Sequence, residues 1–342
     1  MSLREAVARC VEGEEVPAAV LQAAFAEIME GQATPAQTAA LLVGLRRMGE
    51  TVAEIVAGAR ALRAVAETVQ ASHPHTVDTC GTGGTGRSLF SVSTTAAFVV
   101  AGAGLPVAKH GNRAVTSATG SFDTFEALGV NIDLPISRCG EILERIGIAP
   151  VFARTAHPAF RHVGPVRAES GVRTLLNCLG PLLNPAGVRN QLVGVFTDSL
   201  VEPLAQALGE LGADRALVVH GSDGLDEITT TGSTRAALSE GAKVEVLELK
   251  PEDFGLPRVR SEDLEGGDAT RNAEILRQIL AGEAGPRRDM VLLNAGAALW
   301  VGRAAGSLAE GVERAAESID TGAAAKKLEA LIEATQEEGT GP

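Results

Sequence analysis

Short runs of β-branched residues alternate with helical segments from His75 onward, and this alternation restricts the possible folds more than any other feature of the chain. Strands that are separated by helices pair through crossover connections, which give a mostly parallel sheet with helices on both faces. We expect strands at residues 76–79, 105–108, 150–153, 191–196 and 216–220. Residues 238–249 are predicted to form a hairpin that closes the sheet edge, and three Ala-rich helices are predicted from Thr270 onward.

The first 70 residues read as helices throughout. Apolar residues recur at helical spacing, and Thr34-Pro35 and Glu50-Thr51 are typical helix start signals. Residues 158–183 carry helical patterns but no strand, so we expect them to fold back onto the first helices. The sequence therefore predicts an α/β fold in which a small all-helical domain accompanies a larger α/β domain with a central, mostly parallel sheet flanked by helices. The predicted bounds are 1–70 and 158–189 for the helical domain, and 71–157 and 190–342 for the α/β domain.

Composition and charge restrict the partners of the chain. Its 342 residues are 45% hydrophobic, which is enough for a large core and two domains. Thirty basic and 43 acidic residues give a net charge of −13, so the overall field would repel a nucleic acid and an anion would need a local basic pocket. No apolar stretch has the length of a membrane span, and Met1 to Glu15 lacks the apolar core of a signal peptide. We therefore expect a cytoplasmic protein without nucleic-acid or membrane partners.

The reactive residue types do not form a recognisable catalytic arrangement. Four cysteines are scattered without a C-x-x-C pair, which is typical of reduced thiols; they are Cys10, Cys80, Cys139 and Cys178. Although Cys80 adjoins a glycine-rich turn, no base accompanies it, so we interpret it as packing at a strand end. His157 and His162 are separated by Pro158, which breaks helical phase and favours a structural turn over a metal site. We expect no protein nucleophile.

Two turns at predicted strand ends suggest a pocket for phosphates. The first is Gly81-Thr82-Gly83-Gly84-Thr85-Gly86, and the second is Lys109-His110-Gly111-Asn112-Arg113. Glycines let backbone N–H groups approach an anion, and Lys109 and Arg113 would supply countercharge. The glycine spacing matches a dinucleotide fold, but residues 101–109 lack the acid that such a fold places about 20 residues later, and no Gly-Lys-Ser/Thr forms a P-loop. A strongly anionic ligand and a tight structural turn remain the two interpretations.

Two further polar segments follow predicted strands. Ser91-Val92-Ser93-Thr94-Thr95 stands at a helix start, where hydroxyls either cap the helix or bind phosphate and Mg²⁺. Asp226-Glu227 lies on a loop, where adjacent acids either hold Mg²⁺ or are simply solvated.

The ordered motifs of the chain resemble the anthranilate phosphoribosyltransferase family, and the resemblance spans nearly the whole sequence. They are Gly81-Thr-Gly-Gly, Ser93-Thr94, Lys109-His-Gly-Asn-Arg113, Gly120-Ser121, His157-Pro-Ala-Phe-Arg-His-Val-Gly-Pro-Val-Arg167, Gly180-Pro-Leu-Leu-Asn-Pro185 and Asp226-Glu227. The resemblance implies transfer of ribose 5-phosphate from phosphoribosyl pyrophosphate (PRPP) to the amine of anthranilate, in tryptophan biosynthesis. It also implies the fold of pyrimidine nucleoside phosphorylases, Mg²⁺ as cofactor and a homodimer joined through the helices.

The resemblance also implies roles for individual residues. PRPP binding falls to Gly81, Thr82, Gly83, Gly84 and Thr85, to the segment that follows as far as position 89, to Lys109, and to Ser91, Ser93 and Thr94. Ser93 would meet one Mg²⁺, and Asp226 with Glu227 would hold a second. Anthranilate would lie along His110, Asn112, Arg167 and Pro181, with Arg167 pairing with its carboxylate.

Two positions depart from the family pattern. Thr85 stands where the family usually has Asp, and Ser91 stands where it usually has Asn, so we expect altered PRPP binding. A pyrimidine nucleoside phosphorylase would share the fold but should carry a Lys-x-x-x-Gly-Arg loop, which the Lys109 turn does not match. A non-catalytic, nucleic-acid-binding relative would explain both departures but should be basic, and this chain is acidic.

Overall fold

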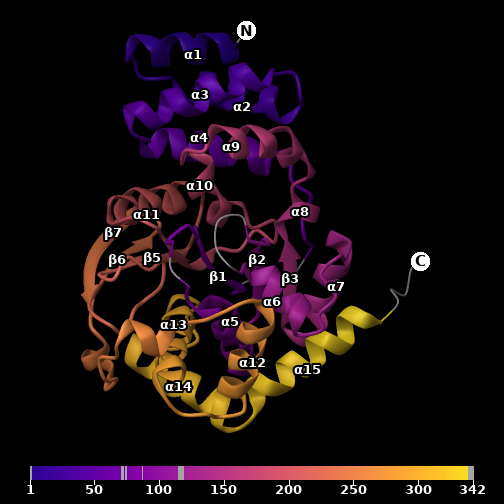
Figure 1. Cartoon of the computed structure of the whole chain (residues 1–342), viewed down its shortest axis with the longest axis vertical. Helices are drawn as coiled ribbons and strands as arrows, with labels where there is room; N and C mark the ends of the chain where they lie inside the picture. Colours follow the sequence, from indigo (N-terminus) through magenta and orange to yellow (C-terminus); the bar gives the residue numbers. More distant parts are fainter. Residues whose placement is uncertain (1, 71–72, 74, 87, 115–118, 338–342) are drawn as a thin grey trace.

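A seven-stranded sheet forms the centre of the larger part of the molecule in this computed structural model, which describes residues 2–70, 73, 75–86, 88–114 and 119–337 (Figure 1). The strand order is β3-β2-β1-β4-β5-β6-β7. The first five strands are parallel and β6 and β7 are antiparallel, which confirms the mostly parallel sheet and the closing hairpin. The strands are β1 Val77–Gly81, β2 Val107–Gly111, β3 Ile148–Phe152, β4 Asn190–Gly194, β5 Arg215–Gly221, β6 Thr234–Glu240 and β7 Lys243–Leu249.

The strand order places a topological switch between β1 and β4. From β1 the chain proceeds to β2 and β3 on one side, and then returns to β4 on the other side. The register pairs Gly81 at the end of β1 with Gly194 at the end of β4. Because loops diverge at such a switch, the carboxyl ends of these strands leave a crevice where open α/β sheets bind ligands. The glycine-rich turn after β1 leads from this position into α5.

Residues of β4 and β5 alternate between two apolar cores, one on each face of the sheet. Leu192, Leu217 and Val219 join one core, whereas Val193 and Val218 join the other, as the two-residue period of a strand requires. The first core lies under α5, α13, α14 and α15, and α11 packs on the other face. The helices of the α/β part are α5 Val92–Gly102, α6 Ser121–Ala127, α7 Ile136–Ile146, α11 Val201–Glu210, α12 Ala269–Leu280, α13 Pro286–Val301, α14 Leu308–Asp320 and α15 Ala323–Gln336.

The carboxy-terminal region contains four helices in the described chain, α12 to α15, where the sequence predicted three. Gly282 and Gly322 both adopt positive φ in the links, at +93° and +73°. These left-handed positions end helices in a tight turn, and Pro286 then restarts the chain as α13. Alanine favours helix on both sides of each link, and the prediction of three helices did not use the glycines that mark the breaks.

The amino-terminal helices stand above the sheet and contact residues from the middle of the chain (Figure 1). They are α1 Ser2–Glu12, α2 Ala18–Met29, α3 Pro35–Met48 and α4 Val52–Arg63. The middle segment is helical, as predicted, and comprises η1 Pro158–His162, α9 Gly164–Ser170, α10 Leu176–Leu179 and η2 Gly180–Leu183, preceded by α8 Ala153–Ala156. Because α9 packs on α3, η1 on α2 and α10 on α4, the middle segment lies against the first helices. The exact domain bounds stay a prediction.

The helix starts at Thr34 and Thr51 are confirmed. Each threonine is the N-cap of its helix and forms a complete capping box, with Gln37 and Glu54 respectively. The Thr51 hydroxyl accepts from the Glu54 N–H at 3.2 Å, and the Glu54 carboxylate accepts from the Thr51 N–H at 2.9 Å.

We predict that Thr51→Ala lowers the thermal midpoint, because it removes an N-cap acceptor and costs about 1 kcal/mol. Glu54 is buried, so its N–H, which loses the Thr51 hydroxyl in this variant, has no easy replacement partner in water. Thr51→Ser keeps the oxygen and is the matched control. Equal losses in both variants, measured by differential scanning calorimetry, would contradict the role of the cap.

Candidate active site

The glycine turn after β1 is shaped by a carboxylate from another loop. The Gly83 N–H donates to Asp226 Oδ2 at 2.7 Å, and a Cβ at Gly81 would overlap the same carboxylate. Gly83 and Gly84 adopt φ of +64° and +77°, a conformation that disfavours side chains. The Thr82 hydroxyl accepts from the Phe196 N–H at 3.0 Å, which ties the turn to the end of β4. The turn therefore needs its glycines because of both close approach and backbone conformation.

A buried ammonium lies beneath this turn. Lys109, on β2, is 1% exposed, and its Nζ donates to the Thr79 carbonyl and, at 3.4 Å, to Ser93 Oγ. Its charge opposes the upward shift of the pKa of both Asp226 and Glu227. The structure therefore brings Lys109, Ser93 and the two predicted acids together at the switch point.

Asp226 and Glu227 make a suitable pair of ligands for a divalent cation. Burial raises the pKa of both carboxyls, and repulsion by Asp226 raises that of Glu227 further. The Ser93 N–H binds Glu227, which places the Ser93 hydroxyl near the acids. Within the described ranges, no group of three or more His, Cys, Asp or Glu side chains could hold a metal. Two carboxylates still fit Mg²⁺, which commonly takes one or two carboxylates and completes its shell with substrate phosphate and water.

The remaining hydroxyls of the predicted PRPP segment have different surroundings. Ser91 is the N-cap residue of α5, but its side chain makes no capping bond and instead lies 2.7 Å from Thr124 Oγ1. Thr94 is buried in the first turn of α5. Position 89 is a leucine that pairs with Glu265 in an isolated bridge, so its side chain cannot hydrogen-bond a phosphate.

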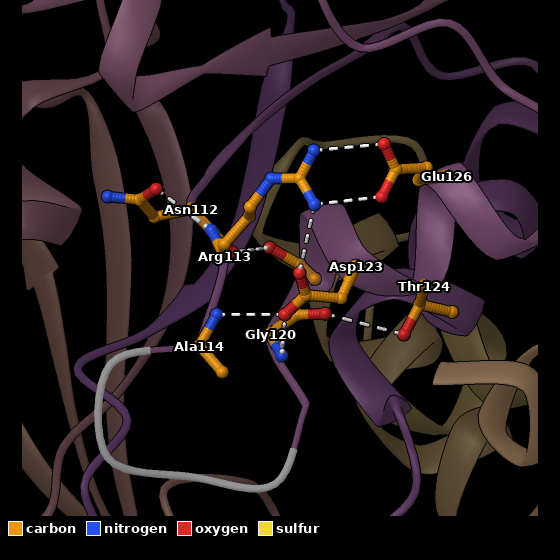
Figure 2. A network of polar contacts seen from close by, with 8 residues as sticks. Asn112, Arg113, Ala114, Gly120, Asp123, Thr124 and Glu126 are labelled. Carbon is orange, nitrogen blue, oxygen red and sulfur yellow. Dashed lines mark hydrogen bonds and ion pairs between the residues drawn. The ribbon is translucent and has the colours of Figure 1, made fainter. Parts of the chain in front are cut away.

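Arg113 is engaged by two carboxylates of α6 (Figure 2). Its two terminal nitrogens lie 2.8 and 2.9 Å from the Glu126 carboxylate, and one lies 3.6 Å from Asp123. Because a bidentate carboxylate neutralises the guanidinium, Arg113 does not provide the free countercharge that the sequence suggested. Lys109 is the buried cation at this place.

Asp123 bridges Ala114 and Gly120 (Figure 2). Its Oδ2 accepts from the Ala114 N–H and from the Gly120 N–H, both at 2.9 Å. A Cβ at Gly120 would overlap the backbone at Arg113 and Ala114. Gly120 therefore lies tightly against the backbone of Asn112 to Ala114, which directly follows β2.

Two histidines contact each other next to Lys109: His110, which follows it on β2, and His157. His110 Nε2 and His157 Nε2 are 3.2 Å apart, and both side chains are buried. Burial lowers the pKa of His157 to about 4 and that of His110 well below its usual value. The His157 ring pairs with His110 and packs near Phe160, which agrees with a structural role for this segment.

A buried carboxylate connects β1, β2 and the Gly-Pro-Leu-Leu-Asn-Pro segment. Asp78 accepts from the His110 N–H at 3.3 Å and from Asn184 Nδ2 at 2.8 Å, and Asn184 Nδ2 also donates to the Ala108 carbonyl. Nearby, the Pro181 carbonyl accepts from Gln191 Nε2 at 2.9 Å. Sequence reasoning missed Asp78 because a single acid inside a strand carries no motif.

Arg167 lies on α9 and is partly buried, which lowers its pKa. Its guanidinium has no hydrogen bond or ion pair to another residue in the part of the chain that the structure describes. Asn112 lies in the second turn, where its Oδ1 accepts from the Arg113 N–H at 2.8 Å. Sequence reasoning also missed Arg173, whose guanidinium donates to the Gly84 carbonyl, because an isolated arginine in a link gives no signal.

All four cysteines are buried free thiols, as predicted. Burial raises the pKa of Cys80 well above its usual value, so this thiol is not activated as a nucleophile.

Comparisons with known proteins agree on one family. A model described as the helical bundle domain of a glycosyl transferase family matches residues 4–66, and one described as the a/b domain of that family matches residues 73–325. The anthranilate phosphoribosyltransferase of Rubrobacter xylanophilus is 53% identical over 331 residues, which cover 96% of each chain. That of Parvibaculum lavamentivorans is 50% identical, also with 96% of each chain covered.

The chain belongs to the anthranilate phosphoribosyltransferase family. The crystal structure of the Thermus thermophilus enzyme superposes with a TM-score of 0.93 at 43% identity, covering 97% of this chain and 99% of that one. The Saccharomyces cerevisiae enzyme in complex with PRPP and Mg superposes with a TM-score of 0.90 at 26% identity, covering 97% of each chain. The family assigned from the motifs and the predicted fold are both confirmed.

In the part of the chain that the structure describes, no helix is long and apolar enough to cross a membrane.

We predict that acid destabilises the protein through His157. Its pKa is about 4 in the folded chain and about 6.5 when unfolded, so the unfolded chain binds a proton first as pH falls. The free energy of unfolding is therefore unaffected by His157 above pH 6.5 and decreases as pH falls toward 4. A difference of this size corresponds to about 3 kcal/mol. Protonation of both rings would also place two like charges at the 3.2 Å contact with His110.

The measurement is the denaturant midpoint between pH 7.5 and pH 4.5. His157→Gln should flatten the pH dependence, whereas His75→Gln, at an exposed position, should leave the slope unchanged. A wild-type slope in His157→Gln would contradict the prediction.

Proposed function

We propose that this protein transfers the 5-phosphoribosyl group of PRPP to the amino group of anthranilate and releases pyrophosphate, as a step of tryptophan biosynthesis. The observation that carries the proposal is the cluster of the glycine turn, Lys109, Ser93 and the Asp226-Glu227 pair at the switch point of the sheet. Relatives of the chain are named for this activity, and the yeast relative has been solved with PRPP and Mg and with 4-fluoroanthranilate.

PRPP is held by backbone amides and by Lys109 in this proposal. The glycine turn leads into the amino terminus of α5, where N–H groups and the helix dipole favour a phosphate. Gly81, Thr82, Gly83, Gly84 and Thr85 form the turn, and Ser91, Ser93 and Thr94 lie at the helix start. Lys109 supplies a fixed positive charge from below, which needs no reorganisation during the reaction.

Mg²⁺ is the proposed cofactor: Ser93 would meet one ion, and Asp226 with Glu227 would hold a second. When bound, Mg²⁺ would neutralise the negative charge that grows on the departing pyrophosphate. The raised pKa of both carboxyls supports this assignment, because a bound cation would offset the cost of burying the two charges and, at Glu227, the repulsion by Asp226.

Anthranilate would lie beside α9 and the second turn. The guanidinium of Arg167 would pair with its carboxylate, and His110, Asn112 and Pro181 would line the path. Burial keeps His110 neutral, so this ring adds no charge beside an aromatic amine. The aryl amine is itself largely neutral at pH 7, so its attack on the ribose carbon, with inversion, needs no protein nucleophile and no strong base. Positioning of the two substrates supplies much of the rate.

The protein is further proposed to be a cytoplasmic homodimer joined through its amino-terminal helices. Val11 on α1 and Val43 on α3 expose 73% and 45% of their surface, which supports an apolar contact there. The net charge of −13 supports the absence of a nucleic-acid partner.

The proposed activity is tested by the loss of anthranilate fluorescence in the presence of PRPP and Mg²⁺. We expect fluorescence to fall with time, a chelator to stop the fall, and Asp226→Asn to slow it about 100-fold, because one carboxylate of the metal site is lost. Asp214→Asn, at a surface ion pair with Arg189, is the matched control and should retain the wild-type rate. No fall at high protein and substrate concentrations would refute the function.

A second prediction concerns Thr85. We expect Thr85→Asp to lower the KM for PRPP severalfold, because a new carboxylate beside the diphosphate can ligate Mg²⁺. Thr85→Asn, which has the same shape without the charge, should change the KM less. An unchanged KM in steady-state assays with Thr85→Asp would contradict the interpretation that Thr85 and Ser91 alter PRPP binding.

A further inference from the structure

Arg173 connects three parts of the site that are distant in sequence. It lies in the link between α9 and α10, its guanidinium donates to the Gly84 carbonyl, and its Cζ lies 4.5 Å from the centre of the Phe196 ring. Gly84 belongs to the turn after β1, and Phe196 follows β4. The side chain therefore spans the switch point from the segment that also carries Arg167.

The two contacts of Arg173 require a planar cation. A guanidinium can stack flat on an aromatic ring and donate in its own plane at the same time, whereas a lysine ammonium cannot do both. The backbone of Phe196 is held in turn by the glycine turn, because its N–H donates to the Thr82 hydroxyl at 3.0 Å. The glycine turn is thus held at Thr82 by the backbone of Phe196 and at Gly84 by Arg173.

The contact with Gly84 determines the direction of the next amide. The described chain has no cis peptide bond, so the Gly84 carbonyl and the Thr85 N–H point in opposite directions across one trans peptide. Because the carbonyl points at Arg173, the Thr85 N–H points away from it. Two residues before Thr85, the Gly83 N–H is directed at Asp226. Two peptides of the turn, Thr82–Gly83 and Gly84–Thr85, are therefore oriented by side chains from other parts of the chain.

We propose that Arg173 is a positioning residue that orients the glycine turn for the diphosphate of PRPP, and that it sets the affinity for this substrate separately from the affinity for the amine. The inference rests on the proposed function for the identity of the substrate. The exposed position of Arg173 would make an ordinary ion pair weak, but its partners here are a backbone carbonyl and an aromatic ring, which it contacts at the same time.

The first test measures PRPP with Mg²⁺ by calorimetry and steady-state kinetics in the full-length protein. Arg173→Gln should raise the Kd and the KM for PRPP about tenfold, because a charge-assisted hydrogen bond and a cation–π contact are lost. The KM for anthranilate should stay within about twofold, since the amine side is untouched. Arg173→Lys should recover only a small part of the loss, and Phe196→Leu combined with Arg173→Gln should be less than additive. Arg189→Gln, at a surface ion pair, is the matched control.

The second test needs no activity. Hydrogen exchange in the peptide covering residues 82–86, without substrate, should be faster in Arg173→Gln than in the wild type and in Arg189→Gln. Unchanged exchange, an unchanged KM for PRPP, or equal rises in both KM values would each overturn the proposal. If the wild type binds no PRPP, the proposed function is refuted. Faster exchange in Arg173→Gln than in the wild type would then still support the role of Arg173 in orienting the turn.

Discussion

The rest of the site depends on the contacts of one buried group, the ammonium of Lys109. A charge removed from water is tolerated only when it is hydrogen-bonded and surrounded by opposite charge, and Lys109 finds the Thr79 carbonyl, Ser93 Oγ and nearby carboxylates. These partners come from β1, the start of α5 and the loop after β5. The position of the cation therefore requires the parallel register that gathers three strand ends at one edge of the sheet.

The middle segment determines how the helical part meets the sheet. Asn184 binds both Asp78 and the Ala108 carbonyl, which secures the end of this segment to β1 and β2. At the other side of the switch point, Arg173 contacts the glycine turn. One continuous segment thus contacts the proposed PRPP side through Arg173 and carries Arg167 on the proposed anthranilate side. This arrangement explains how two substrates could be placed against each other without a covalent link to the protein.

Much of the fold was predictable because its signals are local. Strand ends such as Gly81 and helix starts such as Thr34 and Thr51 are marked by glycine and by capping residues, and the structure agrees with them. The number of carboxy-terminal helices was predicted wrongly, because the prediction followed the helix propensity of alanine on both sides of the Gly282 and Gly322 breaks. The glycines in these links were the local signal that it did not use.

The sequence by itself determined the fold class, the family and the residue types available for an anionic ligand, since motifs and periodicity are properties of neighbouring residues. Only the tertiary structure decided which charges are available. Lys109 and Arg113 belong to one motif, yet the first is buried beneath the glycine turn and the second is neutralised by Glu126. Arg173 carries no motif, yet it reaches Gly84. Charge depends on burial and partners, and those are fixed by contacts between residues that are far apart in the chain.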